Sequence, residues 1–83
     1  MATYPSYTFD SSTNYAQVRE TVMVMLSDLI NQYGCCKPKY VEEAINEALP
    51  FIQCFDYDEA TNTERYKSDV ETSYKLLFNI ANG

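Results

Sequence analysis

Apolar residues recur at steps of three and four positions over residues 14–33. This spacing places them along one side of a helix with about 3.6 residues per turn, so it predicts an amphipathic helix over this range. The apolar stripe consists of Tyr15, Val18, Val22, Met25, Leu29 and Tyr33. Met23, Leu26 and Ile30 lie next to this stripe and predict that the buried face is broad.

Both ends of this predicted helix carry sequence signals. Asn14 is followed three residues later by Gln17, and this spacing predicts a capping box in the first turn. Gly34 follows the last apolar residue of the stripe. Glycine readily adopts the left-handed conformation that often ends a helix, so we expect the helix to stop there.

A second apolar stripe predicts a helix over residues 38–55. Its members are Val41, Ala44, Ile45, Ala48, Ile52 and Phe55, with Leu49 and Phe51 beside them. Pro38 suits the first turn because its φ angle is fixed and it has no N–H group. Pro50 lies inside the pattern and removes the hydrogen bond to the carbonyl of Asn46. We therefore expect a kink at Pro50, or a break into two short helices.

A third stripe predicts a helix over residues 62–81, after a loop with the sequence FDYDEATN. The stripe consists of Tyr66, Val70, Tyr74, Leu77 and Ile80. Thr61 and Glu64 have the spacing of a capping box at the start of this helix.

Helices joined by short turns pack antiparallel. The expected fold is therefore all-α: a small antiparallel three-helix bundle that forms one domain over residues 1–83. A break at Pro50 would give it four helical segments. Residues 1–13 lack a helical period and are expected to form an ordered N-terminal arm. Its aromatic residues Tyr4, Tyr7 and Phe9 either cover the open end of the bundle or contact a partner.

The charge of the chain narrows the range of partners. Twelve acidic and six basic residues give a net charge of −6. Nucleic acids and anionic membranes bind clustered lysine and arginine, so neither is an expected direct partner, whereas a protein with a basic surface is. No apolar run has the roughly 20 residues that span a bilayer or the form of a signal peptide, so a cytoplasmic location is expected, in the host cell if a virus encodes the chain.

The stretch YGCCKPKY is the part of the sequence with the most reactive side chains. It contains Cys35 and Cys36, and Cys54 is the third cysteine of a chain that has no histidine. A catalytic thiol needs a neighbouring base or cation, and a structural zinc ion needs four ligands. We therefore interpret the stretch as a turn between helices, with one of the adjacent cysteines directed inward.

Other chemical sites are also not expected. Asp56 and Asp58 have the spacing of the first two calcium ligands of an EF-hand. An EF-hand loop also needs a ligand at the position of Ala60, a glycine at the position of Thr61 and a glutamate at the position of Lys67, so the match fails. The sequence contains no set of catalytic, cofactor-binding or metal-binding residues, so it predicts a protein that is not an enzyme and needs no cofactor.

Two kinds of side chain remain as candidates for binding a partner. Acidic residues are concentrated in the second half of the chain, and tyrosine is favoured at protein interfaces. The candidate partner-binding residues are Glu42, Glu43, Glu47, Asp56, Asp58, Glu59, Tyr4, Tyr7 and Tyr57.

Two functions compete on these grounds. In the first, the chain is a small acidic interaction module, an accessory inhibitor or regulator such as viruses encode. It would bind and block a protein with a basic surface. If that partner binds nucleic acid, the acidic side chains would imitate the phosphates. In the second, it is a structural subunit of a homo-oligomer or of a larger assembly such as a virus particle.

Overall fold

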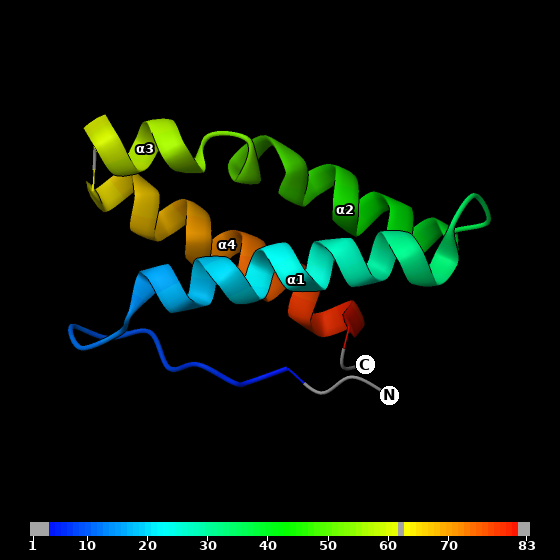
Figure 1. Cartoon of the computed structure of the whole chain (residues 1–83), viewed down its shortest axis with the longest axis horizontal. Helices are drawn as coiled ribbons and strands as arrows, with labels where there is room; N and C mark the ends of the chain where they lie inside the picture. Colours follow the sequence, from blue (N-terminus) through cyan, green and yellow to red (C-terminus); the bar gives the residue numbers. More distant parts are fainter. Residues whose placement is uncertain (1–3, 62, 82–83) are drawn as a thin grey trace.

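The computed structural model describes residues 4–61 and 63–81, and its regular structure within these ranges is entirely helical. The helices are α1 (Tyr15–Tyr33), α2 (Lys39–Ile52), α3 (Phe55–Thr61) and α4 (Thr63–Ala81). α2 and α3 run one after the other in the direction opposite to α1, and α4 returns in the direction of α1 (Figure 1). The predicted antiparallel bundle is therefore confirmed, with the second of its three helices divided in two.

The apolar stripes supply the core. α4 packs against α1, α2 and α3, so it lies at the centre of the bundle. The core side chains are Val18, Val22, Met25, Leu26, Leu29, Val41, Ile45, Ala48, Ile52, Phe55, Tyr66, Val70, Tyr74 and Leu77. The prediction of a broad buried face on α1 is wrong in part: Met23 is 46% exposed and Ile30 is 43% exposed.

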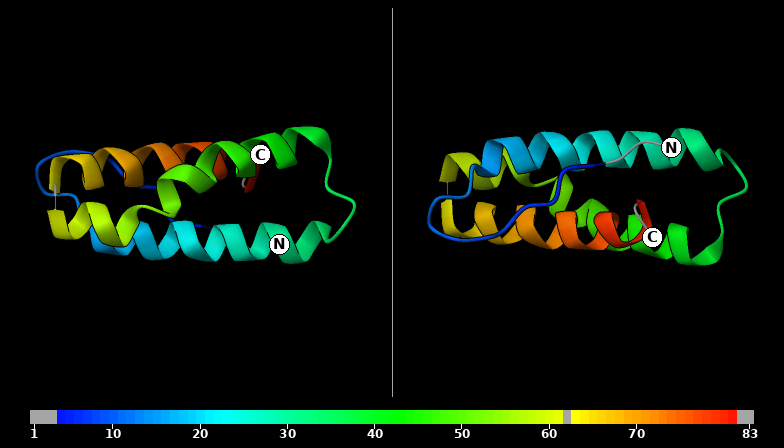
Figure 2. Two further views of the ribbon diagram at one scale, coloured as in Figure 1. Left: turned by 90° about the horizontal axis from the view of Figure 1, so that it is seen from above. Right: turned by 90° about the horizontal axis from the view of Figure 1, so that it is seen from below.

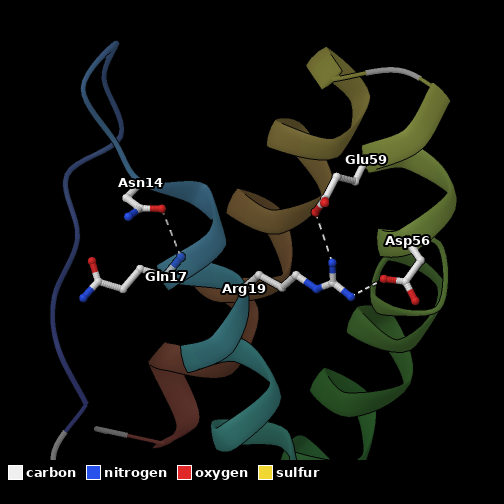
Figure 3. A network of polar contacts seen from close by, with 5 residues as sticks. All are labelled: Asn14, Gln17, Arg19, Asp56 and Glu59. Carbon is white, nitrogen blue, oxygen red and sulfur yellow. Dashed lines mark hydrogen bonds and ion pairs between the residues drawn. The ribbon is translucent and has the colours of Figure 1, made fainter.

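The ends of α1 follow the sequence signals, but only half of the capping box forms. The Asn14 side-chain oxygen accepts a hydrogen bond from the Gln17 N–H at 3.3 Å. The Gln17 side chain points away from Asn14 and does not reach back to it (Figure 3). At the other end, Gly34 has a φ of +56°, and its N–H donates to the Ile30 carbonyl at 2.9 Å.

The chain breaks after Ile52, two residues later than Pro50. The Gln53 N–H still donates to the Leu49 carbonyl at 2.9 Å, but the Cys54 N–H bonds the Phe51 carbonyl, only three residues back, at 3.2 Å. This tighter turn ends α2 and frees Phe55 to start α3. The predicted helix over residues 38–55 is therefore too long at its end.

The predicted loop FDYDEATN is wrong, because residues 55–61 form α3. The predicted cap at Thr61 is also wrong. The Thr61 hydroxyl donates to the Tyr57 carbonyl inside α3 at 2.7 Å, so it belongs to the end of α3 and not to the start of α4.

The N-terminal arm is ordered, as predicted, from residue 4 onward; residues 1–3 lie outside the described ranges. It runs antiparallel to α1 and crosses the face where α1 and α4 lie side by side (Figure 2). A turn then reverses the chain into α1. In this turn the Ser12 N–H donates to the Asp10 carboxylate at 2.8 Å, and the Asp10 N–H donates to the Thr13 hydroxyl at 2.8 Å.

Candidate functional site

Two of the three candidate tyrosines hold the arm to the bundle. The Tyr4 hydroxyl donates to the Asp28 carboxylate, and burial together with this carboxylate raises the pKa of Tyr4 to about 12. The Tyr7 hydroxyl shares a 2.8 Å hydrogen bond with the Thr21 hydroxyl. Tyr57, by contrast, is 70% exposed. Of the three, Tyr57 alone presents most of its ring to solvent.

Asp56 and Glu59 contact an arginine of the same chain. Arg19 of α1 donates through Nη1 to Glu59 Oε2 at 3.1 Å and through Nη2 to Asp56 Oδ1 (Figure 3). Its guanidinium also lies 5.8 Å from the centre of the Phe55 ring. Exposed ion pairs of this kind contribute up to about 1 kcal/mol each. The cluster therefore ties α1 to α3 and leaves one negative charge in excess.

Asp58 is not on the acidic surface, because its side chain is buried between α3 and α4 with Asp69. Arg65 donates to both carboxylate oxygens of Asp69 at 3.2 Å. The Asp58 Oδ2 atom has no hydrogen-bond partner among the described residues. Burial and the neighbouring Asp58 carboxyl raise the pKa of Asp69, and Arg65 opposes this rise.

This pair gives the stability of the protein a distinctive pH dependence. The pKa of Asp69 is raised in the folded state, so the folded protein binds this proton more tightly than the unfolded chain does. The contribution of Asp69 to the free energy of unfolding should therefore increase as the pH falls through that pKa. The gain is complete below the unfolded-state value of about 3.9. Denaturation of the wild type and Asp69→Asn across this pH range measures it, because the two proteins differ at this one carboxylate.

The difference between the two proteins should grow in favour of the wild type as the pH falls. Asp58→Asn should reduce this growth, because it removes the neighbouring carboxyl. A difference that is independent of pH would show that Asp69 is not perturbed.

A hollow lies between α1 and α2, near the turn that joins them. The two helices pack mainly against α4 and not against each other. The hollow has a volume of about 400 Å³. It is lined by Ile30, Cys35, Lys37, Glu42, Ile45 and Asn46.

One partly exposed edge of α1 continues from this hollow toward α3. Arg19, Met23 and Ile30 are separated by four and seven residues, so they lie along one side of the helix. Arg19 reaches α3 at one end of the edge, and Ile30 lines the hollow beside α2 at the other. Met23 lies between them and is 46% exposed. We call the hollow together with this edge of α1, from Arg19 to the turn after α1, the α1–α2 groove.

The three candidate glutamates of α2 do not share one face. Glu42 lines the groove. Glu43 and Glu47 are exposed, but successive residues of a helix are rotated by about 100°, which places both on the adjoining solvent side. Glu43 is 3.9 Å from the Lys39 ammonium. Only Glu42 of the three therefore combines with the exposed apolar side chains of α1.

All three cysteines are exposed, so the prediction that Cys35 or Cys36 is directed inward is wrong. The turn that holds the adjacent pair is closed by two hydrogen bonds: the Cys36 N–H donates to the Tyr33 carbonyl at 3.1 Å, and the Lys37 ammonium donates to the Gly34 carbonyl at 2.7 Å. Within the described ranges, no group of three or more histidine, cysteine, aspartate or glutamate side chains could hold a metal ion.

Comparisons of the chain with protein-family models, curated proteins and solved structures found no match. None of the helices in the described ranges is both long enough and apolar enough to cross a membrane.

The apolar pattern of α1 was interpreted as a broad buried face and did not predict the groove, although the sequence contains a signal for it. Met23 and Ile30 are seven residues apart beside the main stripe of α1. Such a spacing is compatible either with a wide core face or with a second, exposed apolar edge. Deciding between them requires the position of α2.

Proposed function

We propose that this chain is a non-enzymatic interaction module that binds an amphipathic, cationic helix of another protein in the α1–α2 groove, and so acts as an accessory inhibitor or regulator of that protein. The observation that carries the proposal is the exposed apolar edge of Met23 and Ile30 beside a hollow that Ile30 and Ile45 line. Exposed apolar surface rimmed by polar groups is typical of protein contact sites.

The length of the exposed apolar edge favours a helix as the occupant. Seven residues separate Met23 from Ile30, which corresponds to roughly 10 Å along the helix axis. An amphipathic helix presents apolar anchors over the same length at intervals of three, four and seven residues. Such a helix would add a further column to the bundle, beside α1 and α2.

The charges favour a cationic occupant. The chain carries a net charge of −6. At the α3 end of the groove, the two acids around Arg19 exceed it by one charge. At the turn end, Glu42 and Lys37 both line the hollow and offset each other in charge, so the excess negative charge lies at the α3 end. Complementary charge of this kind speeds encounter and weakens as salt is added.

A designed helical peptide with a leucine face and a lysine face tests the proposal. Its dissociation constant is measured by fluorescence anisotropy against the wild type, Met23→Asp and Ile30→Asp. Each substitution should weaken binding about tenfold or more, because it removes apolar contact and places a charge where the peptide would bury it. Glu42→Gln should weaken binding less, by about two- to fivefold, as rim charges do.

Val24→Asp is the matched control. Val24 is on the same helix and is 52% exposed, but it lines a shallow hollow under the arm with Tyr4, Pro5 and Tyr7. The Val24→Asp variant should bind the peptide like the wild type. Thermal melting should show that all variants are folded. An equal loss in Val24→Asp, or none in Met23→Asp and Ile30→Asp, would reject the groove.

The size of the free protein tests the structural-subunit alternative. The proposed module is a monomer without its partner, because net charge of one sign opposes self-association. A stable dimer that Met23→Asp dissociates would instead place a second copy in the groove, and would favour a homo-oligomeric or larger assembly.

A further inference from the structure

The turn between α1 and α2 brings two thiols together at the surface. Cys35 and Cys36 are both exposed, and their Sγ atoms are 3.5 Å apart. Cys54, also exposed, lies at the other end of α2 and belongs to a different turn. The chain therefore contains one close pair of thiols and one single thiol.

We propose that Cys35 and Cys36 form a vicinal dithiol site, which closes to a disulfide by exchange with small-molecule disulfides and chelates trivalent arsenicals. The pair needs no third residue for either reaction, because each thiol is the reaction partner of the other. Thiol–disulfide exchange proceeds through a mixed disulfide, and a second thiol close by resolves it.

Closure by exchange transfers two electrons from the cysteine pair to the small-molecule disulfide. One thiol of the pair loses its proton to solvent and attacks a sulfur of the small-molecule disulfide, whose S–S bond breaks and releases one thiolate. The second cysteine thiolate then attacks the protein sulfur of the mixed disulfide and releases the other half as a second thiolate. The two cysteines are oxidised and the small disulfide is reduced. The two released thiolates take up the two protons that the cysteines lost, so two small thiols result.

Closure of the pair requires the turn to deform. The sulfurs must approach from 3.5 Å to about 2.05 Å. The Cα atoms of adjacent residues are about 3.8 Å apart, less than is usual for a disulfide, so the ring is strained and easily reduced. Residues 35–38 lie outside the helices, so the deformation that closes the ring falls on the turn. The strain of the ring favours a reversible bond.

Chelation of arsenic involves no oxidation. A monosubstituted arsenic(III) oxide condenses with two thiols, forms two As–S bonds and releases one water. Because the metalloid bridges the sulfurs, it does not require them to bond to each other. Phenylarsine oxide is therefore a probe for the pair that ignores single thiols.

The position of Cys35 connects this chemistry to the groove. Cys35 lines the hollow between α1 and α2, so drawing its sulfur toward Cys36 alters the end of the groove. We expect the closed disulfide to weaken docking of the cationic peptide, and this part of the inference rests on the function proposed above.

Mass spectrometry after incubation with oxidised glutathione tests the dithiol. In the wild type, Cys35 and Cys36 should lose two hydrogens and carry no glutathione, while Cys54 carries one. Cys35→Ser and Cys36→Ser should each retain glutathione on the remaining cysteine of the pair, because the resolving thiol is gone. Glutathione that stays on Cys35 or Cys36 of the wild type would overturn the inference.

Phenylarsine oxide supplies an independent measurement. The wild type and Cys54→Ser should each bind one equivalent, and Cys35→Ser and Cys36→Ser should bind none. Retention that depends on Cys54 would count against the pair.

Peptide binding to Cys54→Ser, reduced and oxidised, separates the two proposals. Oxidation should weaken binding by about threefold or more. A closed disulfide with unchanged affinity overturns the link to the groove. A reduced protein that does not bind the peptide overturns the docking function, whatever the mass spectra show.

Discussion

Replacing Tyr74 by alanine should lower the free energy of unfolding by about 3–5 kcal/mol, as truncations of buried aromatic residues do. Tyr74 is 4% exposed. Its ring centre lies 5.4 Å from that of Tyr7, 5.5 Å from that of Phe9 and 5.0 Å from that of Phe78. The substitution therefore leaves a cavity and also removes the aromatic surface on which the arm packs.

Tyr74→Phe separates the hydroxyl from the ring. The hydroxyl donates to the Pro5 carbonyl at 2.9 Å and accepts from the Tyr7 N–H at 3.2 Å. Its loss should cost about 1–2 kcal/mol. Urea denaturation measures both variants, and hydrogen exchange should show faster exchange in the arm for each. Unchanged exchange in the arm, or equal losses for the two variants, would contradict the role assigned to Tyr74.

Phe55→Ala should likewise cost about 3–5 kcal/mol, and it should act first on α3. Phe55 is 2% exposed and packs edge-on against Tyr66, with ring centres 6.3 Å apart. α3 has only seven residues, and isolated helices of that length are marginal in water. Its helical structure therefore depends on docking through Phe55. Hydrogen exchange should show that the amides of α3 lose their protection before those of α1 and α4.

Two controls make this result interpretable. Phe55→Leu keeps much of the buried surface and should cost less than about 1.5 kcal/mol. Tyr57→Ala removes an exposed ring from the same helix and should change stability by no more than about 0.5 kcal/mol. If α3 stays protected in Phe55→Ala, its structure has another origin.

The hydrophobic period of this sequence is sufficient to place α1, α2 and α4 and to predict an antiparallel bundle. Val18, Val22 and Leu29, for example, belong both to the predicted stripe and to the core. The end of α1 at Gly34 is equally local, because it depends on the conformation that a single glycine tolerates. Such features follow from side chains three or four residues apart, and the sequence displays these spacings directly.

The remaining features of the fold, including the exposed edge of α1 in the proposed docking site, depend on contacts between distant residues. Phe55 of α3 packs on Tyr66 of α4. Tyr7 contacts α1 because the arm lies against the bundle, and Tyr4 does the same. Arg19 binds two acidic residues that follow it by 37 and 40 positions. Met23 and Ile30 stay partly exposed because α2 packs on α4 and leaves this edge of α1 uncovered. Periodicity states which face of a helix is apolar, but the packing of the other helices determines how much of that face is buried.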